Sequence, residues 1–149
     1  MMKRASCLIF LFIWFDGLNV LKPLEFPHNQ NTHPVILYKQ HTEDNGKAIY
    51  IKNCLSCHQS DGNGVPQMYP PLLKSNWLSG DKNKLIKVLV YGLNGEIEVN
   101  GEFYDQTMPK FDYLNDSQIS DVLKYIMKFY GNISQDVTVK EVSNIRTSK

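Results

Sequence analysis

The stretch that decides the fold is CLSCH, residues 54–58, in a chain of 149 residues. Its pattern is C-x-x-C-H, the spacing used for attachment of a c-type haem. Two thiols on one turn can each form a thioether with one of the two vinyl groups on a haem edge, and the adjacent histidine is then delivered to the iron. The motif therefore predicts one covalently bound haem c, with Cys54 and Cys57 as anchors and His58 as an iron ligand.

Three other interpretations of the cysteine pair are weaker. A thioredoxin-like dithiol needs a βαβ pattern around it, whereas helical periodicity precedes Cys54 and a glycine-rich loop follows His58. A zinc site needs a second pair of ligands, and no cysteine follows Cys57. A chance match would leave the N-terminal export signal on the same chain unexplained.

The sixth ligand of the iron is sought among the methionines that follow the motif. Met127 lies on the apolar stripe of a predicted helix, which favours a role in the core. Met68 is near enough in sequence to reach the iron at about 3.3 Å per residue, but nearby prolines indicate a stiff loop on the histidine side. Met108 follows much later and precedes Pro109, which favours an extended segment. We therefore predict Met108 as the second axial ligand, and methionine in that position raises the reduction potential.

Composition limits the function classes. The chain has 16 Lys plus Arg, 15 Asp plus Glu and 42% apolar residues. The length of 149 residues fits one domain. The charge balance gives no basic bias of the kind that nucleic-acid-binding proteins show, so no nucleic-acid partner is expected.

Residues 1–20 have the layout of a secretory signal peptide. Lys3 and Arg4 precede an unbroken apolar run from Ala5 to Phe15, which is shorter than the roughly 20 residues of a spanning helix. No A-x-A cleavage pattern follows Phe15, so an uncleaved membrane anchor is the alternative. We expect an exported, periplasmic protein, with membrane association through the N-terminus if the leader is retained, and we assign Cys7 to the leader.

The remaining chain is predicted to hold a linker, one domain and a tail. Prolines and polar residues without a sustained period indicate an extended linker over 21–42, and its histidines lack metal-ligand spacing. The domain is expected over 43–131 and a C-terminal tail over 132–149. The predicted elements are a helix over 43–54, a helix between the Asp81 cap and Gly92, a hairpin over 97–104 turning at Asn100-Gly101, a helix between the Asn115 cap and Gly131, and a short helix from Thr138.

From Gly46 to Gly131 the sequence resembles class I c-type cytochromes of the small bacterial soluble type. The motifs that carry the resemblance follow the family order, and they are Gly46 and Tyr50 before the haem motif, CLSCH, DGNGVPQMYPPLL over 61–73, TMP over 107–109 and VLKYI over 122–126. The resemblance implies a mainly α cytochrome c fold, with about four to five helices around the haem and a short β-hairpin. It also implies that the first helix crosses the helix after Asn115 near Gly46, with Tyr50, Val122 and Tyr125 around the contact.

Further site residues follow from the same resemblance. In the family a proline carbonyl accepts the Nδ1 proton of the ligand histidine, and the best match is Pro70, with Pro71 as the alternative. Trp77 lies where related proteins place a donor to a haem propionate, and an aromatic residue with a purely structural role is the alternative.

These features predict an electron carrier with no catalytic residue of its own. Its expected partners are redox proteins, whose identity the sequence does not reveal. One alternative is a cytochrome subunit of an exported dehydrogenase, reductase or oxidase complex. Another is a five-coordinate haem protein that binds gas or peroxide.

Overall fold

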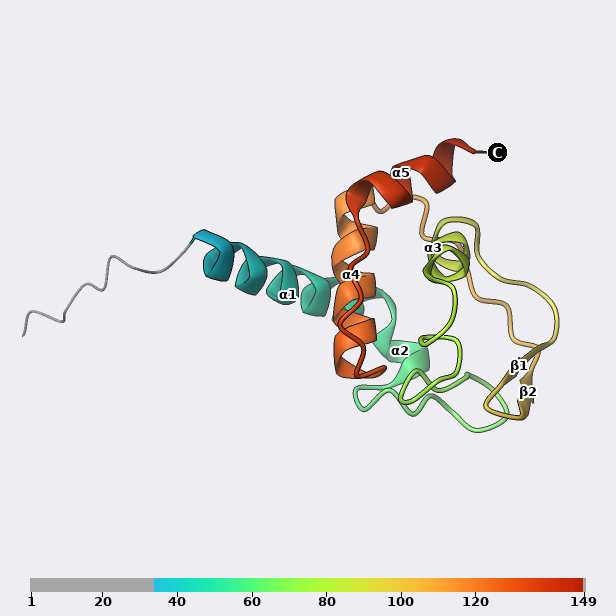
Figure 1. Cartoon of the computed structure of the whole chain (residues 1–149). Helices are drawn as coiled ribbons and strands as arrows, with labels where there is room; N and C mark the ends of the chain where they lie inside the picture. Colours follow the sequence, from blue (N-terminus) through green and yellow to red (C-terminus); the bar gives the residue numbers. More distant parts are fainter. Residues whose placement is uncertain (1–33, 149) are drawn as a thin grey trace, which may run out of the picture. The chain divides into compact units, whose positions relative to one another are not determined.

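The computed structural model describes the backbone of residues 34–148 and the side chains of residues 41–148. The predicted leader, 1–20, and the linker up to residue 33 lie outside the described residues. The mainly α class with one short hairpin is confirmed, since five helices and one two-stranded antiparallel sheet occur within residues 34–148 (Figure 1). The elements are α1 (Pro34–Asn53), α2 (Leu55–His58), α3 (Lys82–Tyr91), β1 (Ile97–Val99), β2 (Glu102–Tyr104), α4 (Asp116–Phe129) and α5 (Val139–Thr147).

The first helix begins earlier than the sequence pattern indicated. We expected an extended linker as far as residue 42, but α1 starts at Pro34. Proline is favoured at the first helical position, because the N–H that it lacks would have no partner in the helix there. Pro34 therefore begins a helix and does not mark a loop. Within residues 34–148, no helix combines the length and apolar character needed to cross a bilayer.

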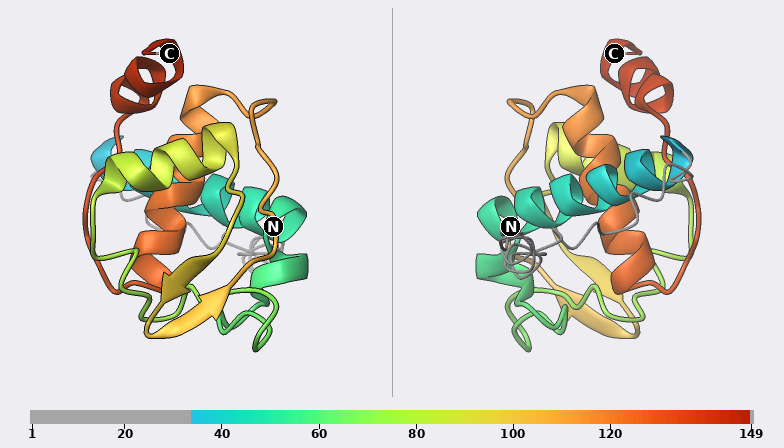
Figure 2. Two further views of the ribbon diagram at one scale, coloured as in Figure 1. Left: turned by 90° about the vertical axis from the view of Figure 1, so that its right-hand side faces the viewer. Right: turned by 90° about the vertical axis from the view of Figure 1, so that its left-hand side faces the viewer.

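The crossing of α1 and α4 organises the domain, and the two helices are seen across each other in Figures 1 and 2. A Cβ atom on Gly46 would lie 2.3 Å from the carbonyl oxygen of Asp121 and 2.7 Å from Cβ of Tyr125. Only glycine allows this approach. The Tyr50 ring packs beside it, with its centroid 5.6 Å from that of Tyr125. The crossing expected near Gly46 is confirmed.

The α4 helix begins and packs as its sequence predicts. Asn115 accepts from the backbone N–H of Gln118, and the Gln118 side chain accepts from the backbone N–H of Asn115, which completes a capping box. The apolar stripe faces the core, because these side chains are almost wholly buried (Ile119, Val122, Leu123, Ile126 and Met127).

The α3 helix and the hairpin form next to each other along the chain. Asp81 caps α3 through the backbone N–H of Asn83, at 2.9 Å. In the hairpin, Asn100 and Gly101 have φ angles of 54° and 88°, as a type I′ turn requires at both central positions. The inward side chain of Val99 is buried and Phe103 is exposed.

The C-terminal tail beyond the predicted boundary at residue 131 packs against the domain. Thr138 and Glu141 form the expected capping box of α5. This helix buries Val142 and Ile145 in the same core as α3 and α4, and ion pairs hold its two ends, Lys82 to Glu141 at 2.7 Å and Arg146 to Asp116 at 2.8 Å. The sequence predicted this helix but not its packing, because the surface against which a short amphipathic helix packs is not evident from its own residues.

Acid is expected to weaken the attachment of α5 through Glu141. The ion pair with Lys82, together with the cap at Thr138, lowers the pKa of Glu141 from 4.5 to about 2. A carboxylate with a lowered folded-state pKa stabilises the fold above pH 4.5, and this stabilisation is lost as the pH falls toward about 2. Glu141→Gln should therefore be less stable than the native chain at neutral pH and should converge with it near the acid end of this window.

The check is urea unfolding of both chains at a series of pH values. Asp136→Asn is the matched control, since it removes a more exposed carboxylate that pairs with Lys124 at 3.1 Å. A stability difference between the Glu141→Gln and native chains that does not change across this pH range would contradict the assignment.

Candidate functional site

The C-x-x-C-H motif forms the short turn of helix on which its function depends. Cys54 precedes α2, and Leu55–His58 make its single turn. Both thiols are free in the structure, with Cys54 buried and Cys57 partly exposed. Burial, and then the neighbouring Cys57, raise the pKa of the Cys54 thiol to about 12, so this thiol is protonated at neutral pH. The two sulfur atoms and the imidazole thus lie within Cys54 and the single helical turn that follows it, as the spacing predicted.

The imidazole of His58 is oriented by one hydrogen bond. Its Nδ1 donates to the carbonyl oxygen of Pro70 at 3.0 Å, so the structure selects Pro70 over Pro71 for this contact. Nε2 is then the unprotonated nitrogen in the neutral ring and carries the lone pair that a metal needs. Burial lowers the pKa of His58, although the Pro70 bond acts in the opposite direction. The ligating, neutral form of the ring is thus favoured.

Two tyrosines form hydrogen bonds with the backbone of the two residues that follow His58. The Tyr50 hydroxyl, from α1, donates to the carbonyl oxygen of Gln59 at 2.6 Å. The Tyr130 hydroxyl, at the end of α4, donates to that of Ser60 at 3.1 Å. Because these two rings also pack together at 5.2 Å between centroids, the α1–α4 crossing directly supports the segment after His58.

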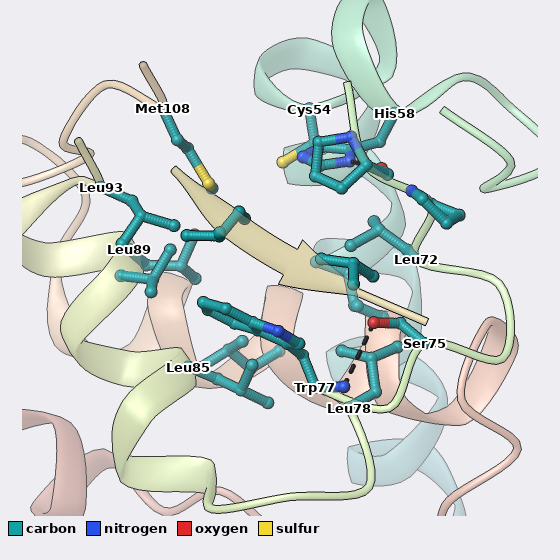
Figure 3. Close-up of a pocket in the computed structure, with 17 residues that line it drawn as sticks. Cys54, His58, Leu72, Ser75, Trp77, Leu78, Leu85, Leu89, Leu93 and Met108 are labelled. Atoms are coloured by element: carbon teal, nitrogen blue, oxygen red, sulfur yellow. Dashed lines mark hydrogen bonds between the residues drawn. The ribbon is translucent and has the colours of Figure 1, made fainter. Parts of the chain in front are cut away.

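An open cavity lies beside His58, with about 650 Å³ of empty space that includes its solvent-open part. Figure 3 shows the Met108 sulfur pointing into it from one side, with Cys54 and His58 on the other and Trp77 forming a further wall. The lining is largely apolar, and it comes from the haem-motif turn, the loop after it, α3, the hairpin, the Met108 segment and α4. The residues are Cys54, His58, Pro70, Pro71, Leu72, Ser75, Trp77, Leu78, Leu85, Val88, Leu89, Leu93, Ile97, Val99, Met108, Leu123 and Ile126.

The three methionines considered as the second iron ligand lie in different surroundings in the structure. Met127 is fully buried in the core of α4, and Met68 is 47% exposed on the loop after the motif. Among the methionines within the described part of the chain, Met108 alone lines the cavity.

Backbone contacts hold Met108 in place. Its N–H donates to the carbonyl oxygen of Leu93, and the N–H of Leu93 donates to the carbonyl oxygen of Met108, both at 2.9 Å. Gly92 makes this approach possible, because it has a φ of 78° and a Cβ there would lie 2.8 Å from the Met108 carbonyl oxygen. The sequence indicated only that Gly92 ends a helix, and the structure shows that it also admits the methionine segment.

Trp77 lines the cavity, but its N–H has a partner within the protein. Nε1 donates to the carbonyl oxygen of Glu98 at 2.8 Å, and the ammonium group of Lys84 lies 3.4 Å from the ring centroid. The Trp77 N–H thus bonds the protein backbone, and the contact with a propionate implied by the resemblance stays a prediction. Trp77 joins its loop to β1 and forms a wall of the cavity.

Sequence reasoning missed several residues of the lining. Leu72, Leu78 and Leu93 lie in irregular segments, where no hydrophobic period marks them. Ser75 is 5% exposed, and its hydroxyl oxygen accepts from the backbone N–H of Trp77 at 3.2 Å (Figure 3). Only the burial of Ser75 marks it as a lining residue, and burial cannot be read from the sequence.

The residues fit a covalently attached haem. Two thiols and an imidazole nitrogen lie on one turn, a thioether points in from the opposite side, and the space between them is lined by apolar groups. Two cysteine sulfurs can form the thioether links to the haem, and one histidine nitrogen with one methionine sulfur is the ligand pair of a His/Met haem iron.

Comparison with known proteins gives the same answer. The family model for cytochrome c matches residues 43–129. The chain belongs to the cytochrome c family. It is 36% identical over 113 residues to cytochrome c-552 of Thermus thermophilus, with 70% of this chain and 86% of that protein covered. The family assignment means covalently attached haem c and electron transfer, without catalysis by the cytochrome itself.

Other relatives of this cytochrome c are parts of larger assemblies. One is the cytochrome subunit of fructose dehydrogenase from Gluconobacter japonicus, 32% identical over 109 residues, which cover 68% of this chain and 22% of that subunit. Another is a cbb3-type cytochrome c oxidase subunit of Cereibacter sphaeroides, 29% identical over 96 residues, covering 62% of this chain and 32% of the subunit. Redox proteins are therefore the class of partner for this family.

Proposed function

We propose that this cytochrome c carries its haem on Cys54 and Cys57 and holds the iron between Nε2 of His58 and the sulfur of Met108. The observation that carries the proposal is the position of His58 and Met108 on opposite sides of one apolar cavity (Figure 3). The Pro70 carbonyl orients the histidine, and the Leu93 bridge positions the methionine.

The bound haem supplies one-electron exchange between ferrous and ferric iron. The protein's residues determine how readily this happens. With His58 and Met108 both bound to the iron, no iron position would be left for a substrate, and the leucine and valine side chains would surround the haem with apolar groups. A dry and rigid site needs little rearrangement when the charge changes, which favours fast transfer.

We also propose that the protein works outside the cytoplasm, delivered to the periplasm by residues 1–20, with the leader either removed or retained as an anchor. The support is the basic and apolar pattern of these residues. Whether it shuttles freely or belongs to a dehydrogenase or oxidase complex is tested by purifying the native protein. Copurification of a catalytic subunit at constant stoichiometry would favour the complex, and a monomer that reduces and oxidises soluble partners would favour the free carrier.

Attachment is tested by replacing both motif cysteines. Cys54→Ala/Cys57→Ala should lose covalent haem, because no thioether can form. A haem-stained denaturing gel and the intact mass of the exported protein measure this. Met68→Ala, at an exposed position, is the control and should keep one haem per chain. Stoichiometric covalent haem in the double variant would contradict the proposed anchors.

A further inference from the structure

The guanidinium of Arg146, on α5, holds the segment that connects Met108 to α4. Its Nε bonds the Asp116 carboxylate at 2.8 Å. Nη1 donates to the carbonyl oxygen of Asp112 at 3.1 Å, and Nη2 donates to that of Leu114 at 2.8 Å. One side chain thus bonds three residues of the segment between Met108 and α4, and the last of them, Asp116, is the first residue of α4.

Arg146 itself lies beyond the residues that the family model matches, although its three partners lie within them. The family model ends at residue 129, whereas α5 spans Val139–Thr147. The helix is itself anchored to α3, since Lys82 pairs with Glu141 and the Tyr91 hydroxyl donates to the carbonyl oxygen of Ile145 at 2.6 Å. From this anchored position on α5, Arg146 reaches the segment that follows Met108.

The rest of the segment after Met108 has its own contacts with α3. The backbone N–H of Phe111 donates to the carbonyl oxygen of Leu89 at 2.8 Å, and the Phe111 ring is buried in the core. The carbonyls beyond Phe111 are the ones that Arg146 binds. Without this fork of Arg146 bonds the segment would keep the Phe111 bond to α3 and the hydrogen bond from the Tyr113 hydroxyl to Asn53, at 2.8 Å, and would lose its attachment to α5. We therefore expect it to loosen while the helices stay folded.

We propose that Arg146 is a positioning residue for the axial methionine, and that through it α5 slows the departure of Met108 from the iron. This inference rests on the ligation proposed above. Bonds from a charged donor are stronger than neutral ones, and the fork restrains the backbone on the C-terminal side of Met108, where the Leu93 bridge does not act. Arginine is required because its planar group offers several donors at once, whereas a lysine ammonium is a point charge.

The test uses the haem-loaded ferric protein and imidazole as an external ligand. At saturating imidazole the binding rate is limited by dissociation of Met108, so that rate reports the restraint directly. In Arg146→Gln we expect it to rise about tenfold, the factor that corresponds to about 1.4 kcal/mol. Arg146→Lys should also raise it, because one ammonium cannot serve two carbonyls and the carboxylate together.

Lys82→Gln is the matched control. It removes the other ion pair that anchors α5 without touching the Met108 segment, and it should change the limiting rate by less than about twofold, as for a partly exposed pair. Equal rates in Arg146→Gln and Lys82→Gln would overturn the proposal, because the effect would then be absent or would come from general loosening of α5.

Amide hydrogen exchange gives a second, independent measurement. In Arg146→Gln, amides of residues 108–114 should exchange faster, while those of α1 and α4 keep their native protection. Faster exchange throughout the domain would mean a stability effect only, and it would overturn the positioning role. A native ferric protein without a sulfur-to-iron absorption band would instead overturn the proposed ligation, and the inference with it.

Discussion

Replacing Met108 with alanine is expected to lower the reduction potential of the haem by on the order of 0.1 V, a fraction of the roughly 0.8 V over which axial ligands tune haem. A thioether ligand raises the potential, and the variant lacks it. Met108 lines the cavity opposite the His58 side, so no neighbouring methionine in the described chain is placed to replace it.

Two measurements check this prediction. Redox titration gives the potential, and the ferric absorption spectrum should lose its long-wavelength sulfur-to-iron band. The Met108→Ala variant should also bind imidazole without the delay that methionine dissociation imposes. Met127→Leu keeps the volume of a fully buried core residue and is the control, with the band retained.

The outcomes also separate the rival functions. A band that survives in Met108→Ala would exclude Met108 as the ligand. A native protein that lacks the band and binds carbon monoxide or peroxide at once would favour the five-coordinate haem protein over the electron carrier.

Gly46→Ala is expected to cost about 3 kcal/mol of the free energy of unfolding, at the upper end of usual overpacking effects. Helix propensity alone would favour alanine by about 1 kcal/mol, so the two effects have opposite signs. Sterics dominate, because the added Cβ would meet the Asp121 carbonyl oxygen at 2.3 Å, and backbone of a packed helix cannot rotate away as a side chain can. The α1–α4 crossing would have to open.

Thermal and urea unfolding of the haem-loaded protein measure this cost, with a fall in Tm of about 10 °C or more. Gly80→Ala is the matched control. A Cβ at Gly80 would make ordinary contacts, 3.4 Å from the Trp77 carbonyl oxygen and 3.7 Å from that of Asn76, so we expect a change within about 0.5 kcal/mol. Equal stability of Gly46→Ala and the native protein would contradict the close crossing.

The parts of the fold that sequence reasoning predicted depend on neighbours in the chain. The capping boxes at Asn115 and Thr138 each join residues three apart, and the Asn100-Gly101 turn needs only its own two backbone conformations. Interactions of this range are encoded directly in short motifs. The same holds for the C-x-x-C-H turn, whose spacing alone places two thiols and an imidazole together.

The parts that it missed depend on residues far apart. The sequence did not reveal that the N–H of Trp77 bonds a carbonyl 21 residues away. The sequence predicted a short helix from Thr138 but not its packing against α3 and α4 in the same core. A helix start at Pro34 was overlooked because proline marks a loop or the first turn of a helix equally well.

By itself, the sequence determined the chemistry of this protein: one covalent haem, a histidine beside it, and a later methionine before a proline. Local spacing suffices for these features. The tertiary structure decided which proline carbonyl bonds His58, which methionine faces the cavity, and that Arg146 bonds the carbonyl oxygen of Asp112, 34 residues earlier in the chain. The reason is physical, since these choices depend on which distant surfaces the burial of apolar side chains brings together.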